Sequence, residues 1–274
     1  MPTLEQNKSY WDGDCSYDWS KSGEEWSTEW GTSFMQWNGT ILPRIRTFLP
    51  AATILEIAPG FGRWTNFLRE FCNNLILVDL SDKCIKACQE RFKNSSQMTY
   101  FVNDGKSLDM IPNNTIDFIF SFDSLVHVED KVISAYVSEI SKKLSQNGVA
   151  FIHHSNLGEY SNHLKIQMMI AKFPKLYSTL IKCGLLDDTK RQWRDPSMSA
   201  RKMQLYAEKN DLQCISQELI VWQTRHIAID CISTITRKDS IWFRDNKVLT
   251  NRSFMREAKY LSTLSHLYDL QKRK

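Results

Sequence analysis

Two glycines that directly follow an apolar run point to a ligand site near residue 60. The stretch ILEIAPGFGRWT spans residues 54–65, with Gly60 and Gly62 just after Pro59. Glycine has no Cβ, so a backbone at such a position can turn sharply and approach a small molecule closely. Two acids would lie beside that ligand: Glu56 within the apolar run, and Asp79, which comes 19 residues after Gly60.

The residues around the glycines limit the kind of ligand. A dinucleotide-binding loop needs a third glycine where this chain has Thr65, and it needs room where Arg63 and Trp64 stand. Glu56 would also repel a diphosphate. A cationic ligand fits better, and S-adenosylmethionine carries both a sulfonium and an ammonium group. Asp79, at the end of the next apolar run, can accept hydrogen bonds from both ribose hydroxyls of such a nucleoside.

These residues must be positioned by an α/β sheet. Short runs rich in Ile, Val and Phe predict strands at 53–58, 74–79, 98–103, 116–122 and 148–154, with helical patterns between them. Runs that are apolar on both faces indicate a parallel sheet buried between helices, which is the doubly wound pattern. Two later runs, 214–222 and 229–237, are only six residues apart, so we expect them to pair antiparallel.

Four motifs in this order resemble those of the class I S-adenosylmethionine-dependent methyltransferases. LEIAPGFG (55–62) is similar to the first family motif, although Ala58 stands where a further glycine is common. LVDLS (77–81), VNDGKSL (102–108) and SFDSLVHVED (121–130) resemble the next three. The resemblance covers residues 50–155 and, more loosely, 198–238. It implies a Rossmann-like seven-stranded sheet with an antiparallel C-terminal strand pair and a helical insertion after strand five.

The resemblance also implies S-adenosyl-L-methionine as cofactor and a set of residues around it. Asp79 would hold the ribose, and Asp104 would lie beside the adenine amino group. The full set of expected cofactor-binding residues is Glu56, Ala58, Gly60, Gly62, Trp64, Asp79, Leu80, Asp104, Gly105 and Ser121. The magnesium site of catechol-type methyltransferases has no obvious counterpart here, so we expect no metal.

Histidines near the ends of strands four and five are candidate general bases. A neutral hydroxyl acceptor must lose a proton, whereas a carboxylate or phosphate oxygen needs no base. His127 follows the fourth strand, His153 and His154 end the fifth, and Asp123 precedes His127. Neighbouring strand residues face opposite ways, so only one of the strand-five pair is expected in the site. Our order of preference for the base is His154, His127, then His153, with Asp123 nearby.

Two regions are expected to shape the acceptor pocket. The N-terminal stretch contains Trp26 and Trp30 among many aromatic residues, and it forms either a lid over the ligand or a helical layer on the sheet. The insertion at 157–197 contains Arg191 and Arg194, which could hold an anionic group of the substrate. An exposed, salt-bridged loop is the alternative for these arginines.

Composition excludes several other classes of protein. A net charge of +4 and the lack of a dense basic stripe argue against a polynucleotide substrate. The loop after strand four also lacks the Pro-Pro pattern and the cysteine of base-modifying enzymes. No uninterrupted window of about 18 apolar residues occurs, so no membrane association is expected. Seven scattered cysteines favour reduced thiols and a cytoplasmic location, and the oligomeric state stays open.

The sequence therefore predicts a methyltransferase in four parts. These are an aromatic-rich N-terminal lid (1–49), a cofactor-binding core (50–156), a helical insertion that forms the substrate pocket (157–197), and the rest of the sheet with a C-terminal helix (198–274). We expect O-methylation of a small molecule, such as a sugar or sugar-linked metabolite, with a histidine base. The alternatives are N-methylation of a small amine and a catalytically silent scaffold that binds the cofactor.

Overall fold

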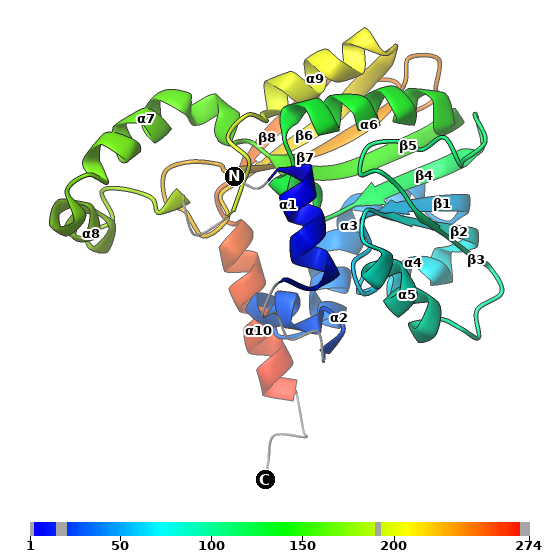
Figure 1. The fold of residues 1–274 in the computed structure, drawn as a ribbon, viewed down its shortest axis with the longest axis horizontal. Helices are drawn as coiled ribbons and strands as arrows, with labels where there is room; N and C mark the ends of the chain where they lie inside the picture. The colour runs from blue at the N-terminus through cyan, green and yellow to red at the C-terminus, as the bar shows by residue number, and fades with distance from the viewer. Residues whose placement is uncertain (1–2, 15–20, 190–192, 269–274) are drawn as a thin grey trace.

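A single mixed β-sheet forms the centre of the molecule in the computed structural model, which describes residues 3–14, 21–189 and 193–268 (Figure 1). The spatial order of its strands is β3-β2-β1-β4-β5-β7-β6-β8. The strands are β1 (Ala51–Ile57), β2 (Cys72–Asp79), β3 (Met98–Val102), β4 (Ile116–Ser121), β5 (Leu144–Ser155), β6 (Leu212–Ile220), β7 (Asp230–Arg237) and β8 (Lys247–Asn251).

The first five strands run parallel to one another, and this confirms the predicted doubly wound core. β7 lies between β5 and β6 and is antiparallel to both, as the short connection between the last two predicted strands required. The expected count of seven strands needs correction, because β8 adds an eighth at the edge, parallel to β6. Four of its five residues are exposed, so it lacks the apolar run that marks a buried strand.

Helices cover both faces of the sheet. They are α1 (Leu4–Ser9), α2 (Ser33–Gln36), α3 (Leu42–Ile45), α4 (Thr65–Leu68), α5 (Asp82–Arg91), α6 (Asp130–Lys143), α7 (Ser161–Ile170), α8 (Pro174–Lys182), α9 (Ala200–Lys209) and α10 (Phe254–Tyr268). Side chains cap two of the core helices: Ser81 accepts a hydrogen bond from the Cys84 N–H, and Ser199 accepts one from the Lys202 N–H.

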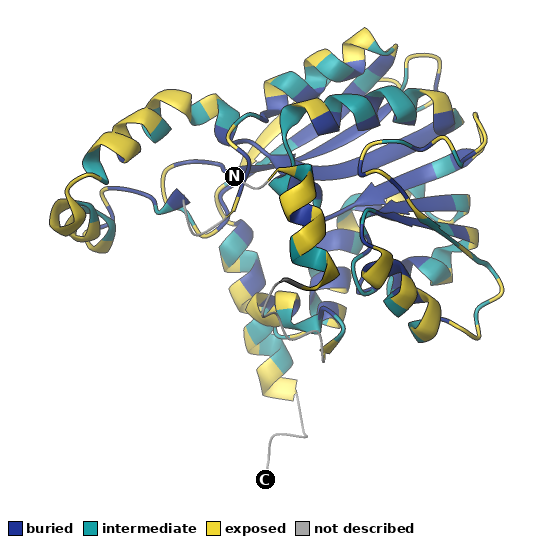
Figure 2. Cartoon of the chain, in the orientation of Figure 1, coloured by how far each residue is buried: buried dark blue, intermediate teal, exposed yellow. Residues whose placement is uncertain are grey.

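Alternate residues of the strands enter two separate apolar clusters. On β4, Phe118 and Phe120 face the cluster that contains Trp30 and Trp37 of the N-terminal segment. Ile119 faces the other cluster, which α6 and α9 cover. Figure 2 shows the strands as the most deeply buried elements, with the helices exposed on their outer sides. The sheet is thus fixed from both faces, and the loops at the carboxyl ends of its strands are left to form a site.

The insertion after β5 projects away from the rest of the molecule. A 3₁₀ segment at Leu157–Tyr160 leads into α7, which is followed by α8 (Figure 1). This hairpin of α7 and α8 reaches outward beside the carboxyl ends of the strands. Across the part of the chain that the structure describes, no helix has both the length and the apolar character needed to cross a membrane.

Candidate active site

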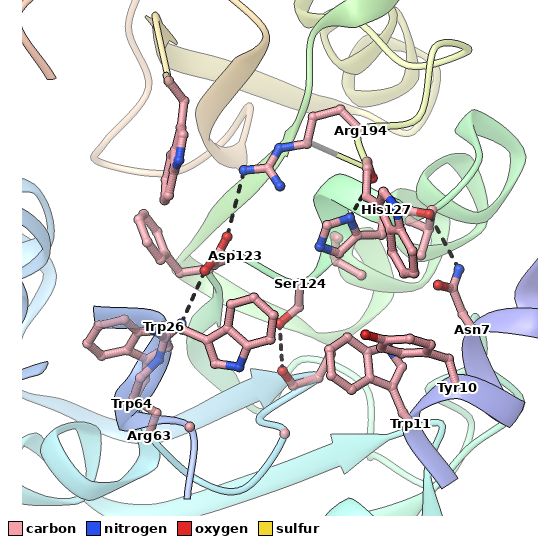
Figure 3. A pocket seen from close by; sticks show the side chains of 18 of the residues that line it. Asn7, Tyr10, Trp11, Trp26, Arg63, Trp64, Asp123, Ser124, His127 and Arg194 are labelled. Atoms are coloured by element: carbon pink, nitrogen blue, oxygen red, sulfur yellow. Dashed lines mark hydrogen bonds and ion pairs between the residues drawn. The ribbon is translucent and has the colours of Figure 1, made fainter. Parts of the chain in front are cut away.

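A pocket of about 870 Å³ lies beyond the carboxyl ends of the parallel strands. Its walls come from the loops that follow β1, β2, β3 and β4, from the N-terminal segment, and from the insertion and the loop after β6. Figure 3 shows side chains from these separate segments pointing into one space. This is the position at which open α/β sheets bind their ligands.

The glycine loop forms the floor of the pocket at Gly60. This residue has φ of 57°, and a Cβ added to it would meet no heavy atom within 4 Å. The space beside Gly60 is therefore open to a ligand, as expected for a glycine over which a ligand must pass closely. Its N–H donates to the Asp79 carboxylate at 3.2 Å, which ties the loop to the end of β2.

Gly62 serves packing rather than the pocket. It has φ of 78° and is not among the lining residues, and an added Cβ would lie 2.5 Å from the ring of Phe92. The prediction that Gly62 contacts the cofactor is therefore corrected, because Gly62 packs closely against Phe92 at the end of α5. Ala58, in contrast, lines the pocket with φ of 57°, and its carbonyl accepts a hydrogen bond from Ser124 Oγ at 2.9 Å.

Asp79 lies at the end of β2 with its carboxylate at the pocket wall. Its two oxygens accept hydrogen bonds from the N–H groups of Ser81 (2.8 Å) and Gly60 (3.2 Å). Burial raises the pKa of Asp79 to about 6. Each carboxylate oxygen has two lone pairs, so Asp79 can still accept hydrogen bonds from a ligand. The neighbouring Leu80 lines the pocket as predicted from the motif.

Glu56 does not reach the pocket. It is buried below the glycine loop, where Thr65 donates a hydrogen bond to it at 2.5 Å. Burial raises its pKa to about 8, so near neutral pH the carboxyl is mostly protonated. The expectation that Glu56 attracts a cationic ligand directly is corrected, because its side chain belongs to the support of the loop. Ser121 is likewise buried and lies outside the pocket lining.

The loop after β3 presents Gly105 to the pocket, and Asp104 points elsewhere. Asp104 is exposed, and its carboxylate accepts the N–H groups of Lys106 (3.0 Å) and Ser107 (2.7 Å). The predicted place of Asp104 beside the adenine is therefore not reproduced. Leu4 of α1 covers Gly105 so closely that an added Cβ there would lie 2.7 Å from Leu4 Cδ1.

His127 is the histidine that the structure brings into the pocket wall. Its Nδ1 lies 2.6 Å from the carbonyl oxygen of Trp193, and a carbonyl can only accept, so Nδ1 carries the proton. Nε2 then keeps its lone pair (Figure 3). Burial, with a contribution from Arg194, lowers the pKa of His127 to about 4. The ring is neutral near pH 7 and oriented as a proton acceptor, although a weak one.

His153 lies behind the pocket wall. It is fully buried, and its Nδ1 accepts a hydrogen bond from the Asp123 N–H at 3.1 Å. Nε2 therefore carries the proton of the neutral ring and faces Asp230 Oδ2 at 3.4 Å. The ring packs between Phe122 and Trp222, both of which line the pocket. His153 can position Asp123 but does not reach a bound substrate.

His154 is correctly predicted to face away from His153, but it is not in the site. It is fully buried, with Nδ1 2.9 Å from the Ser155 carbonyl and Nε2 2.8 Å from Ser233 Oγ. Burial lowers its pKa to about 4. Our first preference for the base is therefore corrected, since both ring nitrogens already have partners inside the protein.

Arg194 and Asp123 face one another in the pocket wall, with Arg194 Nη2 3.8 Å from Asp123 Oδ1 (Figure 3). Arg194 donates to both oxygens of Asp230, at 2.8 and 2.9 Å, and its guanidinium lies 5.2 Å from the ring centre of Trp222. Burial opposes ionisation of Asp230, but the Arg194 ion pair outweighs it and holds the Asp230 pKa well below its usual range. Arg191, predicted beside Arg194, lies outside the described residues.

The aromatic residues of the N-terminal segment divide between the pocket and the core. Tyr10, Trp11 and Trp26 line the pocket. Trp30 instead is fully buried, donates Nε1–H to Thr40 at 2.9 Å and packs on Trp222. The predicted substrate contact of Trp30 is therefore corrected to a core contact. Trp64, predicted near the cofactor, does line the pocket.

Carboxylates outnumber guanidinium groups in the described pocket wall. The lining residues of these two kinds are Glu25, Glu29, Asp79, Asp123, Asp187, Asp188, Arg63, Arg194 and Arg225. Arg63 donates to Asp123 at 3.3 Å, so that pair is internally compensated. Both oxygens of Glu25 are buried and accept no hydrogen bond from any residue that the structure describes. Glu25 interacts electrostatically with Arg63, and its oxygens keep lone pairs that a hydrogen-bond donor of a ligand could use.

Sequence reasoning missed Arg63, Glu25 and Trp222 as pocket residues. The sequence marks Arg63 only as a bulky residue, whereas in the structure its guanidinium lines the pocket and donates to Asp123 and to Ser27 Oγ. Glu25 belongs to an acid-rich stretch of the first thirty residues, which was the one available signal. The place of Glu25 in the pocket wall follows from the packing of the N-terminal segment, which the sequence pattern does not reveal. No group of three or more metal-ligating side chains occurs in the described ranges.

Comparison with known proteins agrees with this geometry. A family model described as a methyltransferase domain matches residues 54–148. The chain is 24% identical over 194 residues to phosphoethanolamine N-methyltransferase 3 of Arabidopsis thaliana, covering 69% of this chain and 39% of that relative. It is 27% identical over 149 residues to phosphoethanolamine N-methyltransferase 1 of Triticum aestivum, covering 51% and 29%. This chain therefore spans less than half the length of either relative.

Solved structures share the fold at low sequence identity. Magnesium protoporphyrin IX methyltransferase from Synechocystis, solved with bound S-adenosylhomocysteine, superposes with a TM-score of 0.54 at 13% identity. The match covers 84% of this chain and 98% of that chain. A protein of Pyrococcus horikoshii gives a TM-score of 0.52 at 17% identity, covering 75% and 91%.

The fold, the glycine loop and the acid at the end of β2 define a nucleoside-binding α/β domain. The match of residues 54–148 to the methyltransferase-domain model, together with this fold, supports a class I S-adenosylmethionine-dependent methyltransferase. S-adenosylmethionine is the cofactor of this family, and two observations fit it here. The space beside Gly60 is open, and Asp79 retains acceptor capacity at the wall.

Proposed function

We propose that this protein transfers a methyl group from S-adenosylmethionine to the nitrogen of a small amine. The observation that carries the proposal is the Glu25 carboxylate, which accepts no hydrogen bond from the described residues and lies in a pocket wall rich in aromatic rings. Carboxylates and aromatic faces together attract a cationic group. The two plant relatives described above are phosphoethanolamine N-methyltransferases, and an amine acceptor is consistent with that likeness.

In this mechanism the residues of the chain bind, orient and stabilise charge. The cofactor supplies a methyl group that is already activated on a sulfonium. Asp79 would hold the ribose at the end of β2. The amine reacts as its neutral base, so an acceptor that binds as an ammonium first loses its proton to water. The nitrogen lone pair then forms the bond to the methyl carbon as the bond from sulfur to methyl breaks, and positive charge moves from sulfur to nitrogen. Glu25 stabilises that charge as it develops.

A hydroxyl acceptor is the second candidate, and His127 favours it. The proton on Nδ1 is fixed by the Trp193 carbonyl, so Nε2 can take a hydroxyl proton while the oxygen attacks the methyl group. This is the reaction that the sequence analysis favoured. We rank the hydroxyl reaction second for two reasons. Burial makes His127 a weak base, with a pKa of about 4, and the hydroxyl reaction gives the Glu25 carboxylate no role.

The test is methyl transfer from labelled S-adenosylmethionine to a panel of small amines and matched alcohols. We expect the label on nitrogen. Glu25→Gln should then raise KM for the amine about 10- to 100-fold, because a hydrogen bond to a charged group contributes about 1.5–3 kcal/mol. Affinity for S-adenosylhomocysteine should change less than about twofold.

Glu24→Gln is the matched control for this variant. Glu24 neighbours Glu25 in the chain, but it lies 3.8 Å from Arg91 and does not line the pocket. Equal effects of the two substitutions would contradict the proposed role of Glu25. Label recovered only on oxygen would support the hydroxyl reaction instead. Tight binding of the cofactor without methyl transfer to any acceptor in extracts would indicate a catalytically silent scaffold instead of an enzyme.

A further inference from the structure

The helical hairpin of residues 161–186 exposes an unusual combination of apolar and basic side chains. Its exposed large apolar residues are Ile166, Met168, Met169, Phe173, Leu176 and Leu185. Phe173 is 64% exposed and Met169 is 66% exposed. Soluble monomers rarely gather such residues on one projecting element unless something covers it.

The hairpin is fixed in place by its inner side. Gln167 is buried, and its Nε2 donates to the Asp187 carbonyl at 2.7 Å and to the Tyr177 hydroxyl at 3.1 Å. Leu164 packs against the main apolar cluster. The outward direction of Ile166 and Met169 follows from these contacts, because the two residues are three apart on α7 and share the face opposite Gln167.

All charge on this segment has one sign. The four charged residues between 161 and 186 are lysines, all of them exposed: Lys165, Lys172, Lys175 and Lys182. The chain has no acid between Glu159 and Asp187. Long lysine side chains beside apolar ones can extend toward phosphates while the apolar groups enter the acyl region. Each lysine near an anionic leaflet adds to the affinity.

We propose that the hairpin 161–186 docks on the surface of an anionic lipid bilayer. α7 and α8 have 10 and 9 residues, too few to span the hydrocarbon core of about 30 Å, so they would lie in the interface. A protein partner would need acidic side chains placed opposite the four lysines and an apolar groove between them. An anionic bilayer offers negative headgroups and an apolar acyl region across its whole surface. We expected no membrane partner from the sequence because it has no segment apolar and long enough to span a bilayer. Docking on the bilayer surface needs no such segment.

Docking would place the pocket mouth next to the lipid surface. Ile181 of α8 and Leu186, at the end of the hairpin, both line the pocket. An acceptor held at or near the surface would then reach the site without crossing bulk water. The hairpin binds the bilayer whether or not the acceptor is an amine, so this proposal does not depend on the proposed reaction.

The test uses sedimentation of the full chain with vesicles of phosphatidylglycerol and phosphatidylcholine, compared with vesicles of phosphatidylcholine alone. We expect binding to the anionic vesicles only, and binding should weaken as salt screens the lysines. Exchanging all four hairpin lysines for glutamine should weaken binding at least about tenfold. Met169→Ser with Phe173→Ser should weaken it at every salt concentration. Because these side chains are exposed, affinity for S-adenosylhomocysteine should stay unchanged and report an intact fold.

A matched control removes the same charge elsewhere. The exposed residues Lys83, Lys86, Lys93 and Lys106 lie outside the hairpin, and exchanging them for glutamine should leave vesicle binding nearly unchanged. Equal losses from the two sets would overturn the assignment to the hairpin. Failure of the native chain to bind anionic vesicles would overturn the proposal. So would a dimer in solution that Phe173→Ser dissociates, because a second copy would then cover this face.

Discussion

Asp79→Ala tests the cofactor site, and the structure provides a matched control for it. The Asp79 carboxylate accepts two backbone N–H groups and faces the pocket, whereas Asp104 accepts two backbone N–H groups but faces away. Both substitutions to alanine remove two loop hydrogen bonds. Only Asp79→Ala also removes an acceptor for the ribose hydroxyls.

The expected loss for Asp79→Ala is about 1–3 kcal/mol in the binding free energy of S-adenosylhomocysteine, or roughly 5- to 150-fold in Kd. Asp104→Ala should cost less than about 0.5 kcal/mol, the usual range for a surface change. Titration calorimetry measures both. Equal affinities of the two variants would refute the ribose role of Asp79. A larger loss in Asp104→Ala would restore the contact expected from the motif.

The pKa of Asp79 adds a pH dependence with a definite sign. Burial raises this pKa to about 6, so the carboxylate is mostly charged at pH 7.5 and mostly protonated at pH 5. Because the charged form is the better acceptor, affinity for S-adenosylhomocysteine should fall about tenfold between those two values. Asp79→Ala should lack this component. A native affinity that is flat across this range would contradict the role assigned to the carboxylate.

Two further predictions concern the base and the N-terminal segment. With a hydroxyl acceptor, His127→Ala should lower the single-turnover rate about 10²–10⁴-fold, whereas the control His266→Ala on exposed α10 should leave the rate unchanged. The native rate should rise with pH through about 4, the pKa of His127, and stay level near pH 7. A loss of less than tenfold in the rate of His127→Ala would contradict the hydroxyl reaction and favour the amine reaction. We also propose that residues 4–14 and 21–29 close over the ligand. Hydrogen exchange at Tyr10, Trp11 and Trp26 should then slow with S-adenosylhomocysteine, whereas exchange at Trp30 in the core should not change. Equal protection with and without ligand would contradict closure.

The sheet was predictable because its central strands have a strong local signal. Strands β1, β2 and β4 are apolar on both faces, and the six residues between the last two predicted strands excluded a parallel crossover. β8 gave no such signal, since an edge strand with exposed side chains reads as a loop. Its place beside β6 is set by tertiary packing.

The candidate site was predictable only where a motif fixes the backbone. Gly60 and Asp79 were found because a tight turn and a strand end require them at a set spacing. Strand parity correctly separated His153 from His154, but it could not reveal that Phe122 and Trp222 cover the inner histidine. Glu25 and Arg63 gain their roles from contacts across the fold, which no local pattern encodes.

The charge of the pocket depends on a residue that does not line it. Asp230 is fully buried, and it neutralises Arg194 through two hydrogen bonds while His153 Nε2 faces one of its oxygens at 3.4 Å. Without Asp230, Arg194 would lose two hydrogen bonds, and Asp123, 3.8 Å away, would be shared between Arg194 and Arg63. The less balanced positive charge beside Trp222 would oppose the binding of a cationic group. If the acceptor is an amine, as we propose, its binding depends on the buried Asp230 as well as on Glu25. A change of acceptor class in a related chain would be expected to involve position 230 together with position 25.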